Sequence, residues 1–267
     1  MTLCHVEAIG LAAPGLEGWA RARAVLAGDS PWTAESAAQE TSSLLPPNER
    51  RRATAAVRQA FRAGEDALAC ATRPAAALAT VFASADGDMN VLHRICHALA
   101  QPTRLVSPTD FHNSVHNAAS GYWSIAAKSM APAMTVAAHD ASFAAGLLEA
   151  ASLVAVESRD VLLIAYDVPA PSPLSAARRI DAPASVALIL TPERTANTQA
   201  SLVLQLVHDD ESYCRAEALE AVRFQNPALR ALPLLEYLAR GECGAVVLPS
   251  TGALKLRIAI HAERNLR

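Results

Sequence analysis

Apolar residues in the first part of the chain switch repeatedly between short continuous runs and helical spacing. The runs predict buried strands at residues 4–11, 75–83, 134–138, 161–165 and 185–190. The helical spacing predicts helices at residues 50–69, 89–99, 114–127 and 142–156. Strands that alternate with helices in this way favour a layered α/β domain.

The pattern changes after Pro192. The tail is predicted to contain strands at residues 200–207, 244–248 and 253–260, and helices at 213–222 and 228–239. About 75 residues are few for an independent domain. We therefore expect a main domain at residues 1–193 and a reduced α/β extension, residues 194–267, packed on it. Exposed loops are predicted at residues 107–113 and 169–183, the latter rich in Pro and Ala.

Composition and charge exclude several classes of function. The chain has 267 residues, of which 52% are hydrophobic, enough for a sizeable core. A net charge of −3 favours neither nucleic acid nor an anionic membrane as a partner. No apolar run reaches the roughly 18 residues of a membrane span, and no signal peptide is expected. Five cysteines without a CxxC spacing predict reduced thiols in a cytoplasmic protein. We predict no cofactor.

Five arginines are concentrated on the helix predicted at residues 50–69. Arg50, Arg51 and Arg52 are consecutive, and Arg58 and Arg62 follow. A solvated helix face is the ordinary explanation for such a run. A docking face for an acidic carrier domain is the alternative, and the sequence leaves both open.

Two pairs of histidines have the i, i+4 spacing that a metal site on a helix requires. They are His93 with His97, and His112 with His116. Neither pair has a carboxylate or cysteine at a convincing third position, and His112 precedes the predicted start of its helix. We therefore predict structural or surface roles for these histidines, and no metal site.

Residues 107–146 concentrate polar side chains among alanines, so the segment is either a functional site or a polar core network. His139 and Asp140 lie between a predicted strand and a predicted helix, where backbone N–H groups and the helix dipole favour an anion. Asp140 is therefore either a helix cap or an ionised group with a role of its own. Ser142 is a candidate nucleophile beside His139, although no GxSxG motif surrounds it.

The same segment resembles the β-ketoacyl synthase family. In that family a Ser-Pro loop leads to a helix with Asn and Gly, a strand, a T-A-C-x-S-G nucleophile turn, a helix and an Asp-Val strand. The matching residues here are Ser107-Pro108, Asn117, Gly121, Thr135 to Ala138, Ala141-Ser142 and Asp160-Val161. The register holds without a gap and places Asp140 where the family has its nucleophilic cysteine.

The resemblance covers residues 4–193 and implies a thiolase-like, layered α/β/α fold with a truncated C-terminal half. Because a carboxylate cannot hold an acyl chain as a stable thioester, Asp140 implies loss of the condensing activity. The sequence looks most similar to synthase-like N-terminal-domain proteins of aryl polyene and xanthomonadin-type pigment biosynthesis. The implied function is a non-catalytic, chain-length-factor-like subunit that pairs with a full-length, active β-ketoacyl-ACP synthase.

The resemblance also implies which residues face that partner. In such dimers the strand before the nucleophile turn pairs across the interface, which implies contacts by Met134, Thr135, Val136, Ala137 and Ala138. The loop before the Asn-Gly helix lies near the floor of the partner's acyl tunnel. The residues implied there are Thr109, Asp110, Phe111, His112 and His116.

Two other functions stay open from the sequence. The first is an enzyme in its own right, which hydrolyses or decarboxylates an acyl thioester with His139, Asp140 and Ser142. The second is a binding module for an acyl carrier protein, through the arginines between residues 50 and 62.

Overall fold

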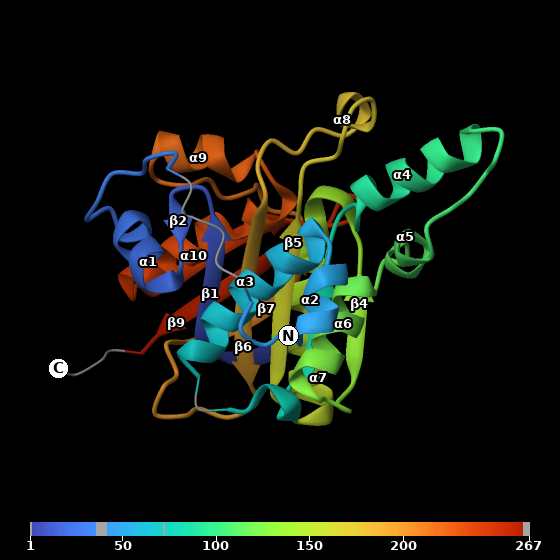
Figure 1. Ribbon diagram of the computed structural model, residues 1–267. Coiled ribbons are helices and arrows are strands. Elements are labelled where there is room, and N and C mark those ends of the chain that lie inside the picture. Colours follow the sequence, from blue (N-terminus) through green and yellow to red (C-terminus); the bar gives the residue numbers. More distant parts are fainter. Residues whose placement is uncertain (1, 36–41, 72, 264–267) are drawn as a thin grey trace.

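A mixed sheet of nine strands forms the middle layer of the protein (Figure 1). The computed structural model describes residues 2–35, 42–71 and 73–263. The strand order is β4-β3-β5-β6-β1-β7-β9-β8, and the short β2 pairs with β1. The strands are β1 Thr2–Ala13, β2 Leu16–Glu17, β3 Ala79–Ala83, β4 Ala133–Val136, β5 Val161–Asp167, β6 Ala184–Thr191, β7 Ala200–Val207, β8 Gly244–Pro249 and β9 Lys255–Ala262.

Helices connect these strands and cover the sheet. The α-helices are α1 Trp19–Ala27, α2 Pro47–Arg52, α3 Ala55–Ala69, α4 Met89–Ala100, α5 Pro108–Asn113, α6 Ala118–Ala127, α7 Ser142–Glu157, α8 Leu174–Ala177, α9 Glu217–Arg223 and α10 Leu232–Arg240. Short 3-10 helices are η1 Ala75–Ala77, η2 His139–Ala141 and η3 Pro227–Ala231. Figure 1 shows α4 and α5 extending away from the body of the molecule, on the side of β4.

The parallel strands β3, β4 and β5 set the position of the candidate site. Phe82 of β3 lies opposite Thr135 of β4 and Ile164 of β5, so the three strands run side by side in register. Their carboxyl ends therefore meet at one end of the sheet, where ligand sites of α/β folds form. β5 is buried along its whole length, which explains its unbroken apolar sequence.

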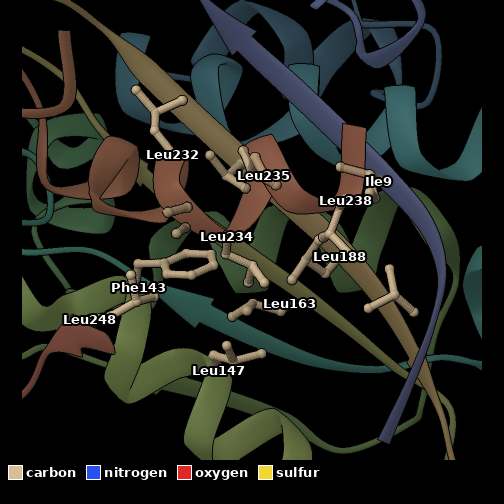
Figure 2. Close-up of a cluster of buried hydrophobic side chains, with 14 of the residues drawn as sticks. Ile9, Phe143, Leu147, Leu163, Leu188, Leu232, Leu234, Leu235, Leu238 and Leu248 are labelled. Carbon is tan, nitrogen blue, oxygen red and sulfur yellow. The ribbon is translucent and has the colours of Figure 1, made fainter. Parts of the chain in front are cut away.

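One face of the sheet packs against α1, α7, α9, η3 and α10. Figure 2 shows Phe143 and Leu147 of α7 near Leu163 of β5 and Leu188 of β6, with leucines of α10 above them. All four of these side chains are fully buried. Because α7 carries alanines between its larger residues, it lies close to the sheet. A Cβ atom at Gly146 would stand 2.7 Å from the Cβ of Ala83.

The opposite face packs against α3 and α6. Trp123 of α6 is fully buried, and its ring centroid lies 4.9 Å from that of Phe61 in α3 and 6.2 Å from that of Phe82 in β3. These aromatic contacts hold α6 and α3 together over the sheet. Gly64 makes room for the indole, since a Cβ there would lie 2.6 Å from Cζ3 of Trp123.

The predicted helix at residues 50–69 is interrupted. α2 ends at Arg52, Ala53 and Thr54 are extended, and α3 begins at Ala55. The Thr54 hydroxyl accepts a hydrogen bond from the Val57 N–H at 3.3 Å and so caps α3. The amphipathic pattern is continuous across this break, so periodicity alone could not reveal it.

Other boundaries also differ from the predictions. The predicted loop at residues 107–113 contains α5, which Ser107 caps and Pro108 begins. The helix predicted from residue 114 starts at Ala118, and the strand predicted from residue 75 starts at Ala79. The strand predicted at residues 134–138 spans Ala133–Val136, so Ala137 and Ala138 lie beyond its end.

The tail shares the sheet of the first part of the chain. β7 pairs antiparallel with the first residues of β1, β9 pairs with β7, and β8 forms the far edge. The domain boundary at residue 193 stays a prediction. Within the described residues, no helix has the length and apolar character needed to cross a membrane.

Candidate functional site

The strand-to-helix turn after β4 carries the residues that the sequence singled out. His139 adopts φ +51°, in the left-handed region, and η2 then leads directly into α7. The Ser142 hydroxyl donates to the His139 carbonyl at 2.7 Å and accepts from the Ala138 N–H at 3.0 Å. Ser142 is buried, and both hydrogen bonds of its hydroxyl stabilise the turn. Its side chain therefore has a structural role and is not free to act as a nucleophile.

Asp140 forms ion pairs with two arginines from distant parts of the chain. The Arg178 Nη2 donates to Oδ1 of Asp140 at 2.8 Å, and the Arg230 Nη2 lies 3.4 Å from Oδ2. The Arg178 guanidinium also contacts Asp86 at 3.3 Å. The Arg178 and Arg230 side chains are 17% and 12% exposed, so both charges depend on these carboxylates for compensation.

The electrostatics keep the Asp140 carboxyl ionised. Burial raises its pKa, but the hydrogen bond and charge of Arg178, together with the charges of Arg230 and His139, outweigh that effect and place the pKa below its usual value. The His139 ring is 69% exposed, with Nδ1 3.8 Å from Oδ2 of Asp140. A carboxylate already paired with two guanidiniums is a weak base, so the turn is arranged for ion pairing rather than for proton transfer.

A second carboxyl, Asp167 at the end of β5, holds the loop after β3. Its Oδ1 accepts hydrogen bonds from the Ser84 hydroxyl at 2.8 Å, the Ala85 N–H at 2.9 Å and the Asp86 N–H at 3.3 Å. The His116 Nε2 lies 3.1 Å from the Ser84 carbonyl oxygen and fastens the same loop from the other side. This loop positions Asp86 against Arg178 and leads into α4.

The Asp167 side chain titrates far from its usual range. Burial raises its pKa to about 7, against the hydrogen bonds from Ser84, Ala85 and Asp86 that lower it. The pKa of this carboxyl is about 4 in the unfolded chain and about 7 in the folded protein. Between pH 4 and pH 7 the carboxyl therefore takes up a proton when the chain folds.

Replacing Asp167 by Asn therefore changes how stability depends on pH. In the wild type this group makes the free energy of unfolding fall as pH rises from about 4 to about 7, by up to about 1.4 kcal/mol per pH unit. Asp167→Asn removes that contribution, which urea unfolding at pH 5 and pH 7 measures. The exposed Asp209, paired with Arg257, supplies the control variant Asp209→Asn. Equal pH slopes for Asp167→Asn and the wild type would show that the side chain does not titrate in this window.

The residues expected near a partner's tunnel do not form one group. Phe111 projects from α5 and is 72% exposed, and His112 is exposed beside the ring of Tyr122. Asp110 accepts from Arg94 at 2.7 Å, and His116 contacts the loop after β3. Of the five expected residues, Thr109, Phe111 and His112 are therefore exposed without a contact to the loop after β3 or to Arg94.

The five arginines between residues 50 and 62 differ in their surroundings. Arg62 pairs with Glu17 at 2.5 Å and is 19% exposed, and Arg50 donates to the Leu45 carbonyl at 2.9 Å. Arg51, Arg52 and Arg58 are exposed. The continuous basic face predicted from the sequence is therefore reduced to these three side chains.

The histidine pairs do not gather further metal ligands. His93 and His97 stack on α4 with ring centroids 6.5 Å apart. Among the described residues no cluster of three or more His, Cys, Asp or Glu side chains has the geometry to hold a metal ion. Neither pair therefore presents a complete ligand set in this part of the chain.

β4 forms one edge of the sheet and pairs only with β3 in the described part of the chain. Ala133 and Met134 are exposed, and Met134 is 43% exposed. Just before the strand, Met130 is 99% exposed. An unpaired strand edge with apolar side chains is a surface to which another chain can add.

Comparison with known proteins identifies the family. The model described as "Beta-ketoacyl synthase, N-terminal domain" matches residues 19–242. The chain belongs to the β-ketoacyl synthase N-terminal-domain family. The family predicted from the residues around Asp140 is thus confirmed, and the match extends beyond residue 193, where the sequence resemblance was expected to end.

Solved structures of this family share the fold. A chain of "Ketosynthase (ApeO) in Complex with its Chain Length Factor (ApeC) from Xenorhabdus doucetiae" has 24% identity and a TM-score of 0.73, with 97% of this chain and 99% of that chain covered. A β-ketoacyl synthase from Burkholderia phymatum STM815 has 13% identity and a TM-score of 0.70, with 99% and 100% covered. A chain of the AntDE:AntF complex, a type II PKS acyl-carrier protein with its ketosynthase bound to the hexaketide, has 11% identity and a TM-score of 0.75, with 98% and 99% covered.

These likenesses establish the thiolase-like, layered α/β/α fold that the resemblance implied. The comparison with curated proteins returns no match. Within this β-ketoacyl synthase fold, Asp140 occupies the turn between β4 and α7, as the sequence register predicted.

Sequence reasoning missed the partners of Asp140. Arg178 lies in the segment predicted as an exposed loop, yet Ile180 and Ala182 of that segment are buried and bring Arg178 over the turn. Arg230 belongs to η3, about 90 residues after Asp140. No local pattern marks either arginine, because the contact depends on how the segments pack.

Proposed function

We propose that this chain is a non-catalytic, chain-length-factor-like subunit that pairs with a full-length β-ketoacyl-ACP synthase, in the biosynthesis of aryl polyene or related polyketide pigments. The pairing takes place in the cytoplasm, where the chain's cysteines stay reduced. The observation that carries this proposal is the exposed, apolar edge of the sheet at β4, next to a turn whose nucleophile position holds an ion-paired carboxylate.

The distribution of exposed apolar side chains supports a large contact on this side. Fourteen large apolar side chains of the described residues are exposed, and eight of them lie between residues 92 and 134. The eight are Leu92, Leu99, Leu105, Phe111, Val115, Ile125, Met130 and Met134. Such a concentration on one part of a chain marks a protein-protein interface more often than a solvated surface.

The shape of the α4–α5 arm, residues 89–113, supports the same contact. Of the twelve residues of α4 only Val91 is buried, so the helix gains little from packing on its own chain. Arg94 of α4 binds Asp110 of α5 and keeps the two helices together. We place Thr109, Phe111 and His112 of this arm at the floor of the partner's acyl tunnel, where their size would limit the chain length.

The turn itself argues against an independent hydrolase. The Ser142 hydroxyl is committed to backbone groups of the turn, and Asp140 is held by Arg178 and Arg230. No hydrogen bond joins the His139 ring to Ser142 among the described residues. A hydroxyl without a general base in contact is a poor nucleophile, so the enzyme alternative lacks its essential pair.

Co-purification tests the proposal. When the chain is co-expressed with an affinity-tagged, full-length synthase, we expect both proteins to elute together in a 1:1 complex by light scattering. The matched control is the same synthase co-expressed with a chain in which residues 130–136 carry polar substitutions. Recovery of the untagged chain as a stable monomer, with no synthase bound, would refute the pairing.

A further inference from the structure

The β3–α4 loop, residues 84–88, attaches the α4–α5 arm to the body of the protein. Asp88 at its end caps α4, since its Oδ1 accepts from the N–H groups of Asn90 and Val91 at 3.1 and 3.0 Å. The Asn90 side chain donates to the Pro169 carbonyl at 3.1 Å. Because Val91 is the one buried residue of α4, these contacts hold the first turn of the helix in place.

The same loop is linked to the Asp140 turn by an arginine. The Arg178 guanidinium contacts Asp86 at 3.3 Å and donates to Oδ1 of Asp140 at 2.8 Å. Networks of hydrogen bonds and ion pairs of this kind carry coupling between separate segments. A movement of the loop would take Asp86 away from Arg178, so the start of α4 and the turn are connected through these three side chains.

One buried residue, Asp167 at the end of β5, fixes the loop. Its Oδ1 accepts from the Ser84 hydroxyl and from the N–H groups of Ala85 and Asp86. Its backbone carbonyl accepts from the neutral Asn226 side chain, between α9 and η3, at 2.9 Å. Asp167 is 1% exposed, and the β6 residue opposite it is an alanine, so water does not reach the carboxyl while the loop is closed.

Negative charge predominates around this carboxyl. The titratable and charged groups around it are, from β5, Tyr166, from the loop, Asp86 and Asp88, from the segment before α6, His116, and from the segment after α8, Arg178. Tyr166 is neutral, because burial raises the pKa of its hydroxyl. Asp86 raises the pKa of Asp167, and no positive side chain of the described residues forms an ion pair with it. An ionised Asp167 is therefore a buried charge without compensation.

We infer that the β3–α4 loop is a pH-sensitive latch, which holds the start of α4 to the Asp140 turn when Asp167 is protonated and loosens when Asp167 is ionised. A protonated carboxyl still accepts hydrogen bonds from the loop but places no charge in the interior. The ionised form is stabilised by opening, because water then solvates it. The latch belongs to the chain alone and does not depend on the pairing proposed above.

The sign of the pH dependence follows from the two states of the loop. In the closed loop burial raises the pKa of Asp167 to about 7. In the open loop the carboxyl is in water and titrates near its ordinary value of about 4. The free energy of opening therefore falls as pH rises from about 4 to about 7, and it is lowest above that range.

Hydrogen exchange of the full chain at pH 5.5 and pH 7.5 tests the latch, with each rate divided by the intrinsic chemical rate at that pH. By this measure residues 85–95 should exchange about ten-fold or more faster at pH 7.5, because opening gains up to about ten-fold per pH unit in this range. Residues 137–143 of the turn should accelerate with them. Peptides covering β6 should not change.

Three variants assign the effect to Asp167. Asp167→Asn keeps an acceptor oxygen for Ser84 but cannot ionise, so its corrected exchange should be equal at the two pH values. Asp209→Asn, which breaks an exposed pair with Arg257, should behave as the wild type. Ser84→Ala removes a donor that favours the ionised carboxyl, so exchange should accelerate at a higher pH than in the wild type. This shift keeps the test decisive if Asp167→Asn does not fold.

Three results would overturn the latch. The first is equal corrected exchange of residues 85–95 at the two pH values in the wild type. The second is the same acceleration in folded Asp167→Asn, or an unshifted pH profile in Ser84→Ala, which would assign the pH dependence to another group. The third is acceleration of the loop without residues 137–143, which would show that the loop and the turn are not coupled.

Discussion

Replacing Met134 by Asp abolishes the co-purification of this chain with its synthase. Met134 lies on the edge strand β4 and is 43% exposed, so the substitution does not disturb the core. In the complex the new carboxylate would be buried against the partner strand without a positive partner. An unpaired buried charge costs about 3–5 kcal/mol, which weakens the complex by about two orders of magnitude or more. Size-exclusion chromatography of the co-expressed pair measures the loss.

Leu206 supplies the matched control for this experiment. It is 44% exposed, lies on β7 in the other half of the same sheet, and has a side chain of similar size. Leu206→Asp should leave the complex intact. If Met134→Asp still co-elutes with the synthase, or if both variants lose it equally, the contact lies elsewhere on the chain.

Replacing Asp140 by Ala should lower the free energy of unfolding by about 1–2 kcal/mol, because the variant loses charge-assisted hydrogen bonds. The loss is moderate since the Asp140 side chain is 40% exposed. Among the described residues, the variant leaves Arg178 with Asp86 as its one ion-pair partner and Arg230 with no carboxylate within 4.0 Å. Urea unfolding at pH 7 measures the change. Asp181→Ala, which breaks the exposed pair with Arg179, should leave the free energy of unfolding almost unchanged and serves as the control.

The Asp140 effect should also depend on pH. Because its folded pKa lies below the ordinary value of about 4, the ion pairs contribute fully above that pH and are lost as pH falls through the lower folded pKa. The difference in the free energy of unfolding between wild type and Asp140→Ala should therefore become smaller at acidic pH. If the two free energies of unfolding differ by the same amount from pH 7 to pH 3, or do not differ at pH 7, Asp140 does not stabilise the fold by ion pairing.

Features that depend on neighbouring residues could be predicted from the sequence. The continuous apolar run of β5 indicated a strand covered on both faces, and its residues do alternate between the two cores. The register of the family pattern placed Asp140 between β4 and α7, because that pattern records a local strand-turn-helix unit. Helix α5 was missed, although Ser107 and Pro108 form a common start signal for a helix.

Features that depend on packing could not be predicted. Arg178 and Arg230 reach Asp140 from segments 38 and 90 residues away, and arginines are common in the chain. Thr54 interrupts a helix whose apolar pattern is unbroken, since the cap depends on backbone geometry. Likewise the basic run looked uniform in the sequence, whereas Glu17 from β2 neutralises Arg62.

Hydrogen exchange at β4 tests the proposed pairing most directly. Within the described residues β4, Ala133–Val136, pairs with β3 on one edge and with no strand on the other, so the amides of that free edge should exchange quickly in the chain alone. In the complex with the synthase, peptides covering residues 130–138 should exchange about ten-fold or more slowly, while those covering β7 should not change. A stable complex in which residues 130–138 exchange as quickly as in the free chain would contradict pairing through this strand.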